Sequence, residues 1–316
     1  MKSSQHKFTT YLVLFAIAPI VAVSAQPTER VLQFTDAVTE TWEFGLEIEA
    51  TGNVRGIVAT VPIPVEWPEQ SIKIIDSKKS KDVSRVDIKE LGGTVKQMTI
   101  HIPQLPKGAT SRTTVTMEIE KRNIVAPENP DQLIFADTKS RKIRVFLTPS
   151  PNIESRHERI VELAEKISID EDDNAWDQVR TIYDWVQNHI DYKFDPTIRT
   201  CIESLDKGQG DCEELSSVFI AICRARGIPA RAVWIPGHTY PEFYLADESG
   251  TGHWIPCQSA GPKEFGSMTE SKPILQKGDK FRIKGHQQQM RYVQPTITAT
   301  DANAAPKLKW IMEKVK

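Results

Sequence analysis

Cysteine, net charge and long apolar stretches are all scarce in this chain of 316 residues. Four cysteines are too few for a scaffold held by disulfides, and 40 Lys and Arg against 42 Asp and Glu leave a net charge of −2. Such a balance argues against an electrostatic surface for nucleic acid or for an anionic membrane. The 39% of hydrophobic residues is too high for a disordered chain, so the sequence predicts a folded globular protein.

The spacing of the cysteines argues against a structural zinc site. They are Cys201, Cys212, Cys223 and Cys257, and no two of them form the C-x-x-C pair that is typical of such sites. We therefore predict no metal site, and we expect no cofactor.

The one long apolar run lies at the amino terminus. Lys2 and Lys7 precede apolar residues 11–23, and small residues follow up to Ala25, as in a secretory signal peptide. About 13 apolar residues interrupted by Pro19 are too short for a bilayer, which needs roughly 20. We expect residues 1–25 to be cleaved after Ala25 and the mature chain to act in the periplasm or outside the cell, without membrane insertion. A retained or lipid-linked amino terminus is the alternative.

Residues 30–150 have the period-two pattern of strands. Apolar and polar side chains alternate in segments such as 42–49, 98–102 and 115–119, and turns rich in Gly and Pro separate the segments. Strands with one buried and one wet face are typical of antiparallel sheets. About seven short strands in this length predict a β-sandwich domain.

The pattern becomes helical in residues 151–262, where apolar residues recur every three or four positions. The chain is therefore predicted to be an α+β protein, with the β-sandwich first. Residues 263–316 are expected to form an extension of short strands and a tail. The last ten residues have a pattern that fits either a strand or an amphipathic helix that packs back onto the body.

Residues 208–214 contain a candidate nucleophile at the start of a predicted helix. Asp211 is suited to the N-cap, and Glu214 completes a capping box, so Cys212 falls in the first turn. The helix dipole favours a thiolate there, and the free N–H groups can bind an oxyanion. We therefore predict that Cys212 is reactive. Cys223 lies three turns further along the same face and is predicted to be a buried core thiol.

Two histidines are candidates for the base that a nucleophilic thiol needs. His238 begins a predicted strand after Gly237, and His253 directly precedes the segment Trp254-Ile255-Pro256-Cys257-Gln258. Spacing alone leaves both open.

Residues 176–261 resemble the transglutaminase-like superfamily, whose members have a papain-like cysteine-enzyme core. The segments that carry the resemblance occur in the family's order: Gly210-Asp211-Cys212, Arg224-Ala225-Arg226-Gly227-Ile228-Pro229-Ala230-Arg231, His238-Thr239-Tyr240 and Trp254-Ile255-Pro256-Cys257-Gln258. The resemblance implies a core of helices packed on an antiparallel sheet over residues 151–262. It also implies Cys212 as nucleophile, His238 as its base and a protein or peptide substrate.

Gln258 departs from the family pattern, which has an Asp that orients the histidine. A carboxylate fixes the imidazole tautomer and stabilises its cation, whereas a Gln oxygen does only the first. A thiol depends less on the carboxylate than a serine does, and papain-like enzymes also use an amide. We expect Gln258 to orient His238. The alternatives are a decayed site, or replacement by Glu242 or Asp247.

The leading hypothesis is an exported cysteine enzyme that attacks amide or peptide carbonyls through a thioester. The acyl group would pass to an amine or to water. The alternative, which Gln258 favours, is a non-catalytic protein that binds a peptide or an envelope polymer. If Cys212 is the nucleophile and Cys223 is buried, Cys201 and Cys257 either form a disulfide or are both free.

Overall fold

The computed structural model describes residues 31–170, 172–283 and 287–315 of the chain. The predicted signal peptide, residues 1–25, lies outside them. Among the described residues there is no helix long and apolar enough to cross a membrane. Val31–Lys316 forms one unit by its internal contacts.

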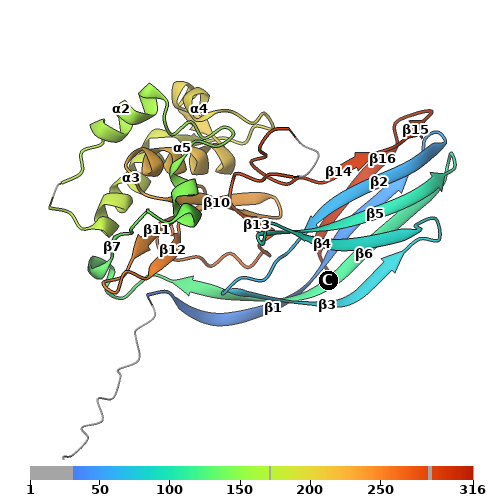
Figure 1. The fold of residues 1–316 in the computed structure, drawn as a ribbon, viewed down its shortest axis with the longest axis horizontal. Coiled ribbons are helices and arrows are strands. Elements are labelled where there is room, and N and C mark those ends of the chain that lie inside the picture. Colours follow the sequence, from blue (N-terminus) through green and yellow to red (C-terminus); the bar gives the residue numbers. More distant parts are fainter. Residues whose placement is uncertain (1–30, 171, 284–286, 316) are drawn as a thin grey trace, which may run out of the picture. The chain divides into compact units, whose positions relative to one another are not determined.

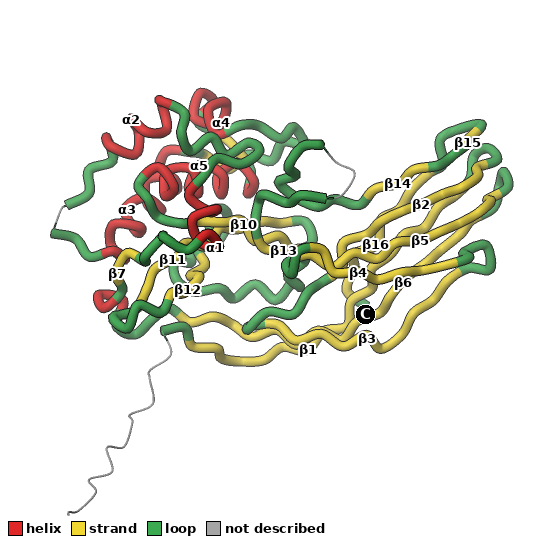
Figure 2. Tube along the Cα trace, viewed as in Figure 1, coloured by secondary structure: helices red, strands yellow, loops and turns green. Residues whose placement is uncertain are grey.

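One part of this unit is a β-sandwich, built from strands in residues 33–125 and 296–314 (Figures 1 and 2). One sheet has four antiparallel strands, in the order β16-β1-β6-β3. The facing strands are β2, β5 and β4, with β14 and β15 added to the free edge of β2. Their bounds are β1 (Gln33–Glu49), β2 (Val54–Ile63), β3 (Gln70–Lys79), β4 (Arg85–Leu91), β5 (Val95–Leu105), β6 (Thr110–Val125), β14 (Thr296–Thr298), β15 (Asp301–Ala302) and β16 (Lys307–Lys314).

Alternation along the strands builds the core of the sandwich. Phe44, Leu46 and Ile48 of β1 are buried in the same apolar cluster as Val61 and Ile63 of β2. Fully burying a side chain of this kind contributes about 1.5–3 kcal/mol. The period-two pattern thus directly determines which face of each strand is inside.

The carboxyl-terminal residues complete the sandwich. β16 pairs with β1 so that Trp310 lies opposite Leu46, and Ile311 is buried. The strand interpretation of the last ten residues is therefore right and the helical one is wrong. Pairing with β1 covers an edge that would otherwise expose unpaired backbone groups.

The second half contains the helices and a sheet of short strands. Its elements are β7 (Ile134–Phe135), α1 (Arg141–Arg144), α2 (Glu158–Lys166), α3 (Ala175–His189), β8 (Asp191–Tyr192), α4 (Cys201–Lys207), β9 (Gln209–Gly210), α5 (Cys212–Ala225), β10 (Ala230–Ile235), β11 (His238–Ala246), β12 (Gly252–Pro256) and β13 (Gln276–Lys277), with short 3-10 turns at Pro130–Gln132 and Val145–Leu147. The helix α5 is almost wholly buried, and α2, α3 and α4 pack around it while its other side contacts β10 and β11.

A short strand joins the two halves into one sheet. β13 pairs with β10 on one side and with β5 on the other, so the ten-stranded sheet runs from the core into the sandwich. Beside this joint lies a group of four buried charged side chains, here called the junction network: Glu69, Arg231, Glu242 and Lys277. Lys277 Nζ lies 2.5 Å from Glu69 Oε1 and 2.6 Å from Glu242 Oε1, and Arg231 Nη2 lies 2.6 Å from Glu242 Oε2.

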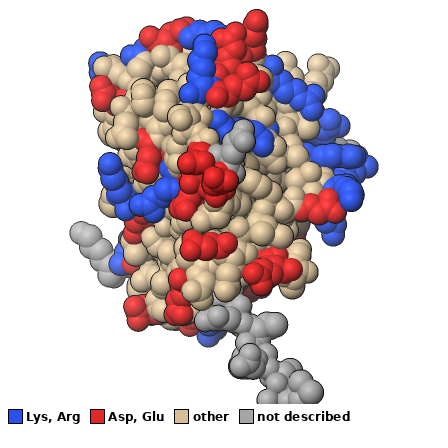
Figure 3. All heavy atoms as spheres, turned by 90° about the vertical axis from the view of Figure 1, so that its left-hand side faces the viewer, with Lys and Arg blue, Asp and Glu red and all other residues tan. Residues whose placement is uncertain are grey.

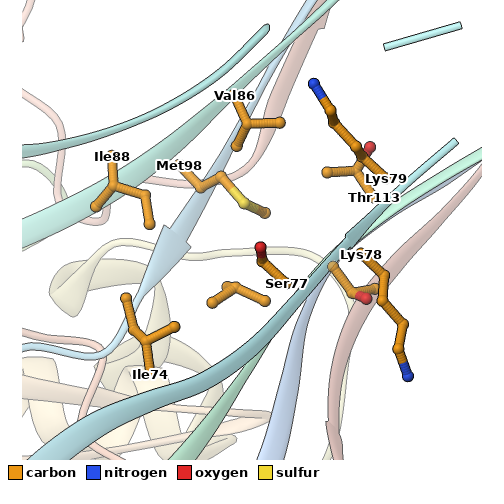
Figure 4. A pocket seen from close by; sticks show the side chains of 10 residues that line it. Ile74, Ser77, Lys78, Lys79, Val86, Ile88, Met98 and Thr113 are labelled. Carbon is orange, nitrogen blue, oxygen red and sulfur yellow. The ribbon is translucent and has the colours of Figure 1, made fainter. Parts of the chain in front are cut away.

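A pocket of about 420 Å³ opens in the sandwich between β3 and β4 (Figure 4). Ile74, Val86, Ile88 and Met98 line it together with lysine and hydroxyl side chains. None of these residues is a predicted site residue. Acidic and basic side chains are interspersed with uncharged ones over the face of the molecule seen in Figure 3.

Candidate active site

The start of α5 is built as the sequence predicts. Asp211 is the N-cap and its carboxylate accepts the N–H of Glu213 at 2.8 Å, while Glu214 Oε2 accepts the N–H of Asp211 at 2.9 Å. Gly210 is required here, because a Cβ on it would lie 2.4 Å from the Cβ of Glu214. Cys212 is therefore held as the first residue of the helix.

Two further features fix the position of this helix. Cys223 is completely buried on its inner stripe, as predicted. Arg291, from the carboxyl-terminal segment, donates to the backbone oxygen of Glu213 at 2.8 Å and to Ser217 Oγ at 2.6 Å. Sequence reasoning missed Arg291, because it lies far along the chain in a polar stretch that has no motif.

His238 and Gln258 meet at the start of β11. His238 Nε2 lies 2.8 Å from Gln258 Oε1. The amide oxygen can only accept a hydrogen bond, so Nε2 donates and carries the ring proton. In the neutral ring Nδ1 is then the nitrogen that can accept a proton.

The backbone of Gln258 is fixed on both sides. Its carbonyl oxygen accepts from Tyr183 Oη at 3.0 Å and from Gln187 Nε2 at 3.0 Å, both on α3. Its N–H donates to the carbonyl of Glu264 at 2.8 Å, and the residue is 5% exposed. These contacts hold the amide in place for its hydrogen bond to His238.

The two acids considered as replacements for Gln258 are bound elsewhere. Glu242 belongs to the junction network, where it pairs with Arg231 and Lys277. Asp247 pairs with His253, whose Nε2 lies 2.9 Å from Asp247 Oδ2.

The structure also separates the two candidate histidines. His253 lies opposite Leu245 on β11. Leu245 is seven residues beyond His238, or about 23 Å along an extended strand. Of the two, only His238 contacts Gln258.

The thiol of Cys212 lies beside the same end of β11. The backbone amide of Thr239, the residue after His238, is near enough to lower the pKa of the Cys212 thiol. Cys212 therefore lies near the start of the strand that carries His238, and His238 is bonded to Gln258 from the segment after β12.

The electrostatics of the thiol differ from the expectation. Burial raises the pKa of Cys212 to about 11, and the carboxylates of Asp211 and Glu213 add to this rise. The Thr239 amide does not offset these effects, so the pKa of Cys212 is raised, contrary to the expectation that the helix start favours the thiolate. Burial also lowers the pKa of His238 below its usual value. The resting pair at neutral pH is therefore a neutral thiol and a neutral imidazole, and an uncharged Gln258 suits such a pair.

The remaining cysteines are free. Cys201, Cys223 and Cys257 are each 0% exposed and unbridged, so the disulfide alternative for Cys201 and Cys257 is not realised.

Among the described residues, no three His, Cys, Asp or Glu side chains form a group that could hold a metal ion.

Comparison with known proteins supports the resemblance. Residues 161–259 match the family model of the transglutaminase-like superfamily, which confirms the similarity inferred from the motifs around Cys212, His238 and Gln258. The fold and this match define an α+β protein with a transglutaminase-like core. No curated protein matches the chain in sequence.

Three solved structures are similar to this chain, and the first of them shares its fold. A candidate cysteine protease from Cytophaga hutchinsonii has a TM-score of 0.62 at 17% identity, over 90% of this chain and 93% of that one. A candidate protease from Parabacteroides distasonis gives 0.29 at 12% identity, over 74% of this chain and 48% of the other. The periplasmic domain of TgpA from Pseudomonas aeruginosa gives 0.33 at 11% identity, over 71% and 90%.

Proposed function

We propose that this chain is an exported cysteine enzyme in which Cys212 attacks amide or peptide carbonyls. The observation that carries the proposal is the hydrogen bond from His238 to Gln258. It leaves Nδ1 of His238 as a base, and the amide of the next residue, Thr239, is near enough to lower the pKa of the Cys212 thiol. The transglutaminase-like match over residues 161–259 supports the same assignment.

The reaction follows from the neutral pair. His238 Nδ1 takes the thiol proton as Sγ bonds to the carbonyl carbon. The C–N bond then breaks, and the imidazolium gives this proton to the leaving amine or ammonia. Water or a second amine attacks the resulting thioester, and the thiol is restored. Water gives hydrolysis, and an amine gives a new amide bond.

Hydrolysis of peptides is the first reaction to test. The similar protein from Cytophaga hutchinsonii is described as a candidate cysteine protease. A protein or peptide substrate fits both hydrolysis of the thioester and its reaction with an amine. The basic, apolar and small residues before position 26 support export to the periplasm or outside the cell.

The test uses fluorescent casein for hydrolysis, and unlabelled casein with a fluorescent primary amine for acyl transfer. We expect product from the unmodified chain and from His253→Ala, whose imidazole lies at the other end of β11. Cys212→Ala and His238→Ala are expected to lose activity by at least roughly 100-fold. Product that persists in Cys212→Ala, or that never depends on Cys212, would overturn the proposal.

A non-catalytic protein that binds a peptide or envelope polymer is the second candidate, and the high pKa of the Cys212 thiol favours it. The variant Gln258→Asp separates the two. A large gain from an inactive parent indicates a decayed site, whereas activity already present in the parent refutes decay.

A further inference from the structure

One short stretch of the surface is unusually apolar. The three most exposed large hydrophobic side chains among the described residues are Phe194 at 72%, Ile198 at 60% and Tyr192 at 59%. They lie within seven consecutive residues between α3 and α4. Large exposed apolar groups gathered at one place commonly mark a binding site.

This stretch adjoins the nucleophile. β8 pairs in parallel with β9 so that Tyr192 lies opposite Gly210, two residues before Cys212. Burial and the nearby Cys212 and Asp211 side chains raise the pKa of the Tyr192 hydroxyl. Lys193 donates its N–H to the Gly210 oxygen at 2.8 Å, so the extended pairing continues past Tyr192.

Hydrogen bonds fix the backbone of this stretch at both ends. Asp191 donates its N–H to the Gly208 oxygen at 2.9 Å. At the other end, Arg199 donates its backbone N–H to Glu214 Oε1 at 3.0 Å and forms a partly buried ion pair with Asp195. The apolar side chains are therefore presented by a fixed backbone, and binding to them costs little loop ordering.

We propose that Tyr192, Phe194 and Ile198 form a nonpolar subsite that receives an aromatic or large aliphatic side chain of the substrate beside the carbonyl attacked by Cys212. All three side chains lie in the segment that begins with β8 and leads to α4. The occupant is a peptide side chain, because the patch adjoins the nucleophile. This proposal rests on the proposed use of Cys212 as nucleophile.

The experiment uses two probes with the same electrophile, 2-iodo-N-benzylacetamide and 2-iodo-N-(2-hydroxyethyl)acetamide. Each transfers its acetamide carbon to Sγ with loss of iodide. Intact mass gives the second-order rate constants at pH 9, and the other three cysteines are 0% exposed. The readout is the ratio of the benzyl rate to the hydroxyethyl rate, with N-acetylcysteine as the reference.

For the unmodified chain we expect a ratio about tenfold above that of N-acetylcysteine, equivalent to about 1.4 kcal/mol. The variant Phe194→Ser/Ile198→Ser should bring the ratio to within about threefold of the reference, because the benzyl group then loses most of its apolar contact. Ile74→Ser and Phe135→Ser remove exposed apolar side chains elsewhere and should leave the ratio unchanged.

Two outcomes would overturn the subsite: a ratio equal to that of N-acetylcysteine in the unmodified chain, or a high ratio that survives the double substitution. Failure of the proposed function is a different result. In that case no casein product depends on Cys212, whatever the ratio of the two alkylation rates.

Discussion

The junction network and the candidate active site both bury polar side chains, but only the network buries opposite charges. At the joint, the carboxylates of Glu69 and Glu242 lie within 2.7 Å of Lys277 or Arg231, and these four side chains are at most 11% exposed. At the candidate site, Cys212 and His238 are both neutral at rest and the orienting group is an amide. The network is therefore suited to holding the two halves of the unit together at the β13 joint, and the site keeps a proton that can move.

The comparison also explains why Glu242 does not take the place of the family's Asp. Arg231 and Lys277 hold the pKa of Glu242 below its usual value even though burial would raise it. A carboxylate with two buried cations as partners is not available to orient an imidazole. Gln258 is left as the group that reaches His238.

The largest expected effect is on stability, from removing the centre of the network. Lys277→Met leaves two buried carboxylates short of a partner, and we expect a loss of about 3–5 kcal/mol in the free energy of unfolding. Urea denaturation measures it. Lys78→Met is the control, because the side chain of Lys78 is 72% exposed and its ion pair with Asp76 lies on the surface. A change below about 1 kcal/mol for Lys277→Met would show that the network does not hold the joint.

The next effect is on activity, from removing the orienting amide. Gln258→Ala leaves His238 without its hydrogen-bond partner, and we expect kcat/KM to fall by roughly 100-fold. Asp247→Ala is the matched control, because it removes the partner of His253 instead, and activity should stay within about twofold. Equal activity in both variants would mean that Gln258 does not orient the base.

Particular residues show which parts of the structure can be predicted from the sequence. The alternation in β1 and the capping box before Cys212 predict their local structures, because both depend on neighbours in the chain. The prediction for Gln258 came from the resemblance. The structure gives its hydrogen bond to His238, and its orienting role stays a prediction.

Other features depend on contacts between distant segments. Arg291 on the first turn of α5 and the joint at β13 have no local signal, because their partners lie far away in the sequence. The expectation that the helix start lowers the pKa of Cys212 was wrong for a similar reason. The helix start is visible in the sequence, but the burial that overrides it comes from packing.

The smallest effect tests whether the neutral character of the site matters. Activity needs unprotonated His238, and burial lowers the pKa of that imidazole, with Glu270 and Lys272 acting in opposite directions nearby. We therefore expect kcat/KM of the unmodified chain to be constant from about pH 7 to 8 and to fall only below pH ~6.5, the ordinary value for histidine. In Gln258→Asp, the new carboxylate favours the imidazolium, so the acid limb should move to higher pH by about one unit. Casein hydrolysis from pH 5 to 9 measures the acid limb of the unmodified chain and of Gln258→Asp. Asp247→Asn is the control, and its acid limb should stay in place. An acid limb at the same pH in Gln258→Asp would mean that residue 258 does not affect the pKa of His238. The uncharged side chain at this position would then have no effect on activity, unlike the charges of the junction network on stability.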